Sequence, residues 1–273
     1  MKITFSVDTM KKLLLCPPTF YDIRYEINPW MDRTNSIDKA KTQEEYNTLT
    51  YAYDQLGITY DELGCVEELP DQVFTTDLGH AEKNIFIKAN FKYPERQKEA
   101  EIAEHYFKDK GYEIKTMPED VFFEGGDFLK INDTYLFGYG KRSSKEAAAH
   151  LSEILHKEIL SIELPDEYYY HLDTCVAPLN QDTVLVHEKA LTDDGMALIR
   201  ETFPTIIPTS EEDNKNFACN LVTFDNDLIM TQGISNELKD TLTEKGFRII
   251  TIPMSQYLKG GGSVHCVSME IFE

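Results

Sequence analysis

The sequence predicts an α/β fold in which one unit, made of two strands, a helix and a third strand, is repeated around a ring. The 273 residues are 41% hydrophobic and 27% charged, which is typical of a globular protein with a substantial core. Apolar runs with the composition of β-strands each end at a proline, and we call these five the marker prolines: Pro70, Pro118, Pro165, Pro208 and Pro253. Successive prolines lie 43 to 48 residues apart, and a regular period of that size indicates a repeated supersecondary unit.

The first complete unit follows Pro70. Two apolar runs, QVFTTDLGH (72–80) and NIFIKANF (84–91), are expected to form neighbouring strands. The stretch 94–111 begins with proline and ends with glycine, and its composition favours a helix. The run YEIKTM (112–117) is the expected third strand of this unit.

The next three units repeat this order, and no linker or low-complexity tract separates them. Their paired strand runs are 121–140, 168–187 and 216–233. Their helices are expected at 143–157, 193–203 and 234–246, and their last strands at 158–164, 205–208 and 247–253. We therefore expect one catalytic domain over residues 1–273.

The fifth unit is divided between the two ends of the sequence. The run SVHCVSMEIF (263–272) supplies its first strand and KKLLLCPPTF (11–20) its second. The helix is expected at 39–57 and the last strand at CVEEL (65–69). Pairing of the first two runs would close the ring and remove the exposed edges of an open array. The insertion 25–38 interrupts this unit, and long loops of this kind often carry function.

The charge balance limits the partners. Lys and Arg number 27 and Asp and Glu 48, which gives a formal net charge of −21 at pH 7. Nucleic acid and anionic membranes are therefore poor partners, whereas a small cationic molecule is electrostatically favoured. The apolar run near the N-terminus is too short for a signal or a membrane span, so we expect a cytoplasmic location. Five cysteines lack disulfide-framework or zinc-site spacing: Cys16, Cys65, Cys175, Cys219 and Cys266.

Polar side chains recur at the same place in each repeated unit, shortly after its marker proline. If the first strand of every unit points to the ring axis, these side chains converge there. They are Asp77, Glu124, Asp127, His171, Asp173, Asn220 and Cys266. Each segment alone also fits an ordinary role, such as a hairpin turn for EGGD or a core position for the histidine. Because these residues occupy the same place in each unit, a shared functional site on the axis is favoured.

Several carboxylates buried together need a cation as partner. A metal is one candidate, but a planar guanidinium fits better because its N–H donors match paired carboxylates, and a neighbouring thiol could attack its carbon. His171 and Asp173 are two residues apart, so we expect them on one face of a strand. His265 is next to Cys266 and should point to the opposite face, which argues against it as the base.

Several motifs together resemble the guanidine-modifying enzymes of the pentein superfamily, which are arginine deiminases, dimethylarginine dimethylaminohydrolases and amidinotransferases. The motifs are VFTTD, FEGGDFL, HLDTC, CPPTFYDIRYEINPWMD, YPERQKEA, GYGKRSS, NFACN and LKGGGSVHC. The similarity covers nearly the whole chain and is closest to the arginine dihydrolase and dimethylargininase-like branch. It implies a five-bladed pseudosymmetric α/β propeller of ββαβ units with the site on its axis.

The resemblance also implies roles for individual residues. It makes Cys266 the nucleophile and His171 the general acid and base, and it makes Asp77, Glu124 and Asp173 the carboxylates that hold the guanidinium. Arg96 and Arg142 match positions that grip the substrate carboxylate, and Asn28 matches a residue of the substrate-covering loop. No metal or organic cofactor is expected. Self-association into a homo-oligomer stays open.

Two acids depart from the closest branch. Dihydrolases of this branch carry Asn where this sequence has Asp77, and dimethylargininases usually lack the acid at Asp173. The pair is more like that of a deiminase or an amidinotransferase, although amidinotransferases of creatine synthesis are longer. We expect hydrolysis of a guanidinium C–N bond through a covalent thiouronium, giving citrulline or a related ureido product. Double hydrolysis to ornithine, amidino transfer and a non-catalytic binding protein of the same fold remain alternatives.

Overall fold

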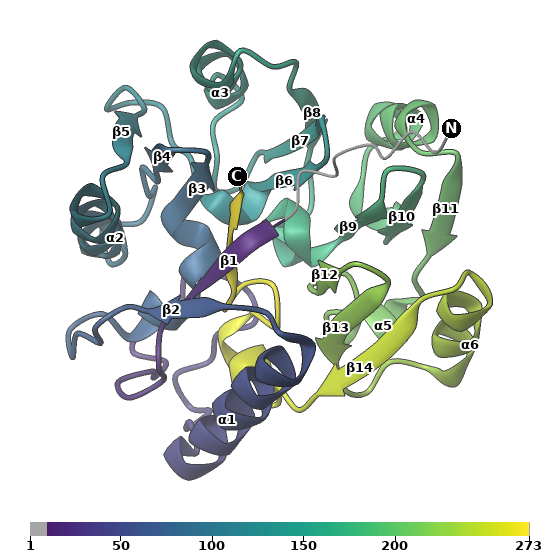
Figure 1. The fold of residues 1–273 in the computed structure, drawn as a ribbon, viewed down its shortest axis with the longest axis horizontal. Helices are drawn as coiled ribbons and strands as arrows, with labels where there is room; N and C mark the ends of the chain where they lie inside the picture. The colour runs from purple at the N-terminus through teal and green to yellow at the C-terminus, as the bar shows by residue number, and fades with distance from the viewer. Residues whose placement is uncertain (1–9, 273) are drawn as a thin grey trace.

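The computed structural model describes residues 10–272, and within them five blades surround a common centre (Figure 1). Each blade carries one long helix at the rim of the ring, while the first strand of each blade lies near the middle. The rim helices are α2 (Gln97–Asp109), α3 (Ala147–Leu155), α4 (Asp193–Thr202), α6 (Asn236–Glu244) and α1 (Lys39–Leu56). A short helix, α5 (Glu211–Lys215), lies outside the repeat.

Every blade has the predicted order of strand, strand, helix and strand. The first strands are β3 (Gly79–Glu82), β6 (Phe128–Ile131), β9 (Val176–Asn180), β12 (Val222–Phe224) and β15 (Met269–Phe272). The second strands are β4 (Ile85–Lys88), β7 (Thr134–Tyr139), β10 (Thr183–Val186), β13 (Asp227–Thr231) and β1 (Met10–Leu15). The third strands are β5 (Glu113–Thr116), β8 (Leu160–Glu163), β11 (Thr205–Pro208), β14 (Arg248–Ile252) and β2 (Tyr60–Glu62).

Strand pairing is the same in all five blades. The first strand is antiparallel to the second, and the second is parallel to the third. Because a helix crosses over between the parallel strands, each blade is one compact βαβ arrangement with an added antiparallel strand. The predicted five-bladed α/β propeller is confirmed.

The predicted closure of the ring is confirmed as well. Strand β15 pairs antiparallel with β1, where Met269 faces Leu14, and parallel with β3, where Ile271 faces Ala81. The split blade and the first complete blade therefore share one six-stranded sheet, whereas each of the other three blades has a three-stranded sheet. The strand that follows Cys266 is thus held on both sides.

The segments that precede the first strands are not strands, and this part of the sequence prediction was wrong. They form 3-10 turns at Thr75–Leu78, Gly125–Asp127 and Leu172–Thr174. Short-range bonds stabilise these turns, for example from the backbone N–H of Asp127 to the carbonyl of Glu124, at 3.1 Å. The turns of neighbouring blades pack closely at this depth, since a Cβ on Gly125 would lie 2.0 Å from the carbonyl oxygen of Thr76.

The last strand of the split blade was also misplaced. It is β2, at Tyr60–Glu62, and not the CVEEL run at 65–69. The side chain of Gln72 fixes that run in a turn, because it accepts from the backbone N–H of Val66 at 3.0 Å and donates to the carbonyl of Gly64 at 2.8 Å. Side-chain bonds of this kind offer the backbone an alternative to a ladder.

Apolar side chains fill the space between each sheet and its helix. In the first complete blade Phe86 of β4 stacks on Phe107 of α2, with ring centroids 4.0 Å apart. Both rings are fully buried, in one cluster with Ala100, Ala103 and Leu78. This packing fixes helix α2, and with it Arg96 directly before the helix. None of the helices between residues 10 and 272 combines the length and apolar character needed to cross a membrane.

We expect Phe86→Ala to lower the free energy of unfolding by about 3–5 kcal/mol, because it leaves a cavity in a close-packed cluster. Tyr51→Ala is the matched control, since the Tyr51 side chain is 64% exposed. That substitution should change the free energy of unfolding by less than about 0.5 kcal/mol. Urea denaturation measures both values, and similar losses in the two variants would contradict this packing.

Candidate active site

The turns that precede the first strands gather their polar side chains at the centre of the ring. Contacts within hydrogen-bond or ion-pair distance link Cys266 with Asp173, and His171 with both Asp77 and Glu124. A backbone bond of 3.1 Å from Thr76 to the carbonyl of Cys266 joins the thiol-bearing turn to the Asp77 turn. The residues predicted to converge on the axis therefore do so, although they lie on turns rather than on strands.

A tight turn delivers the thiol of Cys266. Gly261 has a φ of 91°, a left-handed conformation that favours glycine. A Cβ on Gly262 would lie 2.5 Å from the Phe74 ring, so the backbone approaches too closely for any side chain. Asn220 then fixes the turn, since its Oδ1 accepts from the backbone N–H groups of Ser263 and Cys266, each at 3.0 Å.

Two side chains contact the Cys266 sulfur. Asn220 Nδ2 donates to Sγ at 3.1 Å, and the thiol donates to Asp173 Oδ2 at 3.3 Å. Burial raises the pKa of the Cys266 thiol well above its usual value, and the charges of Asp173 and Asp77 raise it further. Without a bound cation the thiol is therefore protonated, and a cation beside it would favour the thiolate.

His171 lies fully buried between two carboxylates. Its Nε2 is 2.9 Å from Glu124 Oε2, and its Nδ1 is 3.3 Å from Asp77 Oδ1 without hydrogen-bond geometry. Burial alone would lower the pKa of the imidazole, but the charge of Asp77 and the bond to Glu124 outweigh it and raise the pKa to about 9. His171 is thus an imidazolium at neutral pH and is suited to donate a proton.

Both predicted arginines are bound to carboxylates of the cluster. Arg142 Nη1 donates to Glu124 Oε2 at 2.8 Å, and its guanidinium lies over the rings of Tyr93 and Tyr170. Arg96 donates to Asp77 at 2.5 Å and twice to Glu99, at 2.7 and 2.9 Å. Each arginine is almost fully buried. Their role in gripping a substrate carboxylate stays a prediction.

Within residues 10–272, the side chain of Asn28 forms no hydrogen bond with the cluster and instead anchors the insertion 25–38. Its Nδ2 donates to the carbonyl of Gly260 at 3.0 Å, and its Oδ1 accepts from the backbone of Trp30 at 2.9 Å. Arg142 ties the same insertion to the cluster, because its Nη2 donates to the carbonyl of Ile27 at 3.1 Å. The loop is therefore fastened to the glycine turn and to an arginine of the site.

Many acceptor oxygens of the cluster are unused. Within residues 10–272, one buried oxygen of each of six carboxylates has no hydrogen-bond partner: Asp71, Asp77, Glu99, Glu124, Asp127 and Asp173. A buried acceptor without a donor costs about 1–3 kcal/mol. Burial also raises the pKa of Asp127 to about 7. The unused carboxylate oxygens of the cluster can therefore accept hydrogen bonds from a ligand with several N–H donors.

Sequence reasoning missed some members of this cluster. Asp71 follows Pro70 directly. Acidic residues also follow two of the other marker prolines, so this position in the sequence did not distinguish Asp71 as a site residue. Burial raises its pKa to about 6 despite the nearby Arg96. Asn220 was placed at the axis, but its contacts with the sulfur come from a neighbouring blade and have no local sequence signal.

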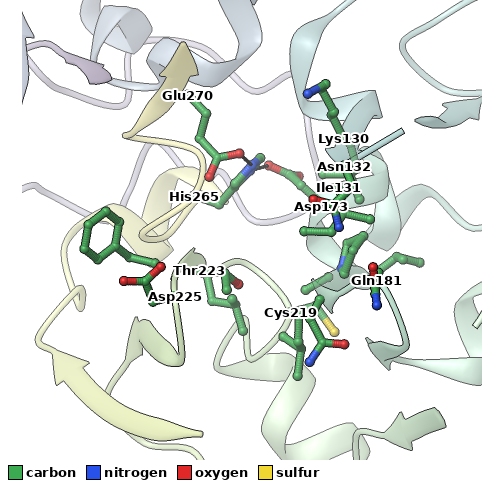
Figure 2. A pocket seen from close by; sticks show the side chains of 18 of the residues that line it. Lys130, Ile131, Asn132, Asp173, Gln181, Cys219, Thr223, Asp225, His265 and Glu270 are labelled. Atoms are coloured by element: carbon green, nitrogen blue, oxygen red, sulfur yellow. Dashed lines mark hydrogen bonds and ion pairs between the residues drawn. The ribbon is translucent and has the colours of Figure 1, made fainter. Parts of the chain in front are cut away.

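A cavity of about 780 Å³ lies beside this cluster (Figure 2). Asp173 and His265 line it, together with Lys130 and Glu270, whereas Cys266, His171 and Glu124 do not. Its remaining wall is mainly apolar and comes from the first strands of several blades. Asp173, whose carboxylate accepts from the Cys266 thiol at 3.3 Å, therefore lies between the cavity and the thiol.

Comparisons with known proteins agree with this geometry. The chain is 32% identical over 268 residues to the bifunctional arginine dihydrolase/ornithine cyclodeaminase of Synechocystis sp.. This alignment covers 96% of this chain but only 38% of that relative. It is 31% identical to the N(G),N(G)-dimethylarginine dimethylaminohydrolase of Mycobacterium tuberculosis, with 96% of this chain and 86% of that protein aligned.

A solved structure has the same fold. It is the N-terminal domain of the cyanobacterial arginine dihydrolase ArgZ, a cysteine-to-serine variant bound to substrate, with a TM-score of 0.92 and 31% identity. The alignment covers 96% of this chain and 98% of that domain. A family model described as N,N dimethylarginine dimethylhydrolase, eukaryotic, matches residues 24–273. With this match and these relatives, the chain belongs to the N,N-dimethylarginine dimethylhydrolase family of guanidine-modifying enzymes.

Proposed function

We propose that this protein is a cysteine-dependent hydrolase that cleaves a guanidinium C–N bond of arginine or an arginine derivative and releases citrulline or a related ureido product. One observation carries the proposal. Carboxylates with unused acceptor oxygens surround a buried thiol and an imidazolium. A guanidinium offers five N–H donors in one plane, and these match paired carboxylate acceptors.

Substrate binding and thiol activation are coupled in this proposal. The free oxygens of Asp77, Glu124 and Asp173 accept from the guanidinium, which supplies the positive charge that the cluster lacks. That charge lowers the pKa of Cys266 and favours the thiolate, which is the nucleophilic form. Arg142 and Arg96 would exchange part of their carboxylate contacts for the substrate carboxylate.

The reaction then proceeds in two steps. The Cys266 thiolate attacks the guanidinium carbon, and a tetrahedral adduct forms. His171, as imidazolium, protonates the departing amine, whose loss leaves a covalent thiouronium on Cys266. The neutral His171 then takes a proton from water, which adds to the thiouronium carbon. The ureido product leaves with its oxygen from water, and the thiolate is regenerated.

Arginine dihydrolysis to ornithine is the second candidate. The similarity to cyanobacterial arginine dihydrolases favours it, with a TM-score of 0.92 over 96% of the chain. Asp77 argues for a single hydrolysis, because the dihydrolases of this branch carry Asn at that position. Since this chain spans 38% of the length of the bifunctional cyanobacterial relatives, cyclodeaminase activity is no part of the proposal.

The proposal extends to the setting of the enzyme. We place one catalytic domain over residues 1–273, supported by the sheet that joins the two ends of residues 10–272. A cytoplasmic location is supported by five cysteines that are all free. The partner is a small cationic guanidino compound, and assembly into a homo-oligomer remains open.

We expect Cys266→Ser to fold and bind substrate but to lose turnover by several orders of magnitude, because it lacks the nucleophile. Cys65→Ala is the control, since Cys65 is a partly buried free thiol outside the cluster. Products from arginine, methylated arginines and agmatine should be measured for both variants and the wild type.

The products decide between the candidates. Citrulline from the wild type supports single hydrolysis, and ornithine with ammonia supports dihydrolysis. A product that requires an added amine acceptor indicates amidino transfer, and no product with any substrate indicates a binding protein. Mass spectrometry of wild-type enzyme quenched during turnover should find the adduct on the Cys266 peptide. An adduct on another cysteine would overturn the mechanism.

Arg142→Ala tests the predicted grip on the substrate carboxylate. Loss of one charge-assisted contact, worth about 1.5–3 kcal/mol, should raise the KM for arginine roughly ten- to a hundredfold and have less effect on agmatine, which lacks the carboxylate. Arg248→Ala is the control because Arg248 is exposed and pairs with Asp227 far from the cluster. If kcat falls equally with both substrates, Arg142 acts through Glu124 instead.

The raised pKa of His171 makes stability depend on pH. The imidazole gains stability from its carboxylates while it is protonated in the folded state, so its contribution is complete below pH 6.5 and lost as pH rises through about 9. The free energy of unfolding should therefore fall by about 3 kcal/mol across this window. Urea denaturation at several pH values should show a shallower fall in His171→Gln. His105→Gln, a control at an exposed position, should keep the wild-type slope.

A further inference from the structure

His265 shares a carboxylate oxygen with the thiol. Asp173 Oδ2 lies 2.9 Å from His265 Nδ1 and 3.3 Å from the Cys266 sulfur. The sequence argument that His265 points away from the site assumed a strand, and it was wrong. The segment is a turn, closed by a 2.9 Å bond from the backbone N–H of Ser268 to the carbonyl of His265. Neighbouring side chains of a turn can reach the same group.

We propose that His265 controls the ionisation of Cys266 by holding a positive charge against the Asp173 carboxylate. It is a positioning residue that acts through Asp173, and the inference rests on the proposed role of Cys266 as nucleophile. The carboxylate of Asp173 opposes thiolate formation because two negative charges would then lie 3.3 Å apart. An imidazolium bonded to the same oxygen offsets that repulsion.

The groups around His265 support a protonated ring. Asp173 and Asp77 face it from two turns, and Glu270 of β15 lies 4.0 Å from its Nε2. Burial lowers the pKa of His265, but the bond to Asp173 and the charges of these three acids outweigh burial and raise it. Lys130 of β6 lines the same cavity, and its charge acts on Glu270.

The other histidine of the cluster does not serve this purpose. His171 is bonded to Glu124 and paired with Asp77. Within residues 10–272, the side chains that hydrogen-bond to the Cys266 sulfur are Asn220 and Asp173. The charge of Asp173 is therefore the one nearest the thiol, and the ring bonded to it is His265.

His265 lies on the cavity side of the cluster, whereas Cys266 does not line the cavity. Figure 2 shows its ring between Glu270 and Asp173 on the wall of the 780 Å³ cavity. His265 is 8% exposed, whereas Cys266 is 1% exposed. The ring of His265 is therefore in contact with the cavity, while the thiol is shielded from it.

The test measures the ionisation of Cys266 without turnover. The rate of iodoacetamide alkylation should be followed from pH 6 to 10 by mass spectrometry of the Cys266 peptide. In His265→Gln the midpoint should rise by about one pH unit, so alkylation below the midpoint should be about tenfold slower. His80→Gln is the control, because His80 is a buried histidine paired with Glu82 and has no contact with Cys266. It should keep the wild-type midpoint.

The same measurement in an Asp173→Asn variant tests whether His265 acts on Cys266 through Asp173. In Asp173→Asn the midpoint should fall, because a negative charge is removed. There His265 loses the partner that keeps it protonated, so adding His265→Gln should produce no further shift. An unchanged midpoint in His265→Gln, or a full shift in the Asp173→Asn background, would overturn the proposal. Failure to turn over any guanidino substrate would instead count against the proposed function.

A measurement on the wild type guards against a variant that does not fold. With 15N-labelled histidine, NMR should show both ring nitrogens of His265 protonated at pH 7. The His265 signal can be assigned by its response to alkylation of Cys266. A neutral His265 ring at pH 7 would contradict the inference without any substitution.

Discussion

A carboxylate removed from water keeps its charge only where cations or hydrogen-bond donors replace the water. Several buried acids meet at the centre of this ring, and the surrounding arginines and histidines compensate their negative charge. Arg142 and His171 share one oxygen of Glu124, and they hold the pKa of that acid at about 2 despite complete burial. Acids with less compensation, such as Asp127, have raised pKa values. The site is therefore stable without substrate but still short of positive charge.

This shortage explains why the thiol and the acids are kept together. In the proposed mechanism a bound guanidinium supplies the missing charge, and the same charge makes Cys266 reactive. Binding and activation are then one electrostatic event, which limits reaction of the thiol in the empty enzyme. The raised pKa of unliganded Cys266 fits this arrangement, because a protonated, buried thiol is protected from oxidation.

Much of this arrangement could be predicted from the sequence. The marker prolines revealed the repeat, because four of the five blades end their third strand at, or within two residues before, such a proline. Asp77, Glu124 and His171 follow these prolines at similar distances, which placed them at the axis. The local conformation was harder, since VFTTD is strand-like in composition but turns where no ladder partner exists. The pairing of Arg142 with Glu124 joins the two ends of one hairpin, and that of His265 with Asp173 joins two blades, and neither contact leaves a local sequence signal.

The six-stranded sheet also bears on how the protein acquires activity. Strand β15 fills the gap between β1 and β3, and Cys266, the proposed nucleophile, lies in the turn directly before it. A nascent chain that has not yet produced residues 263–272 has no thiol at its centre. Under the proposed mechanism, such a chain is catalytically inactive. The pairing of β15 with β1, such as Met269 with Leu14, also joins residues far apart in the sequence, and non-local contacts of this kind slow folding.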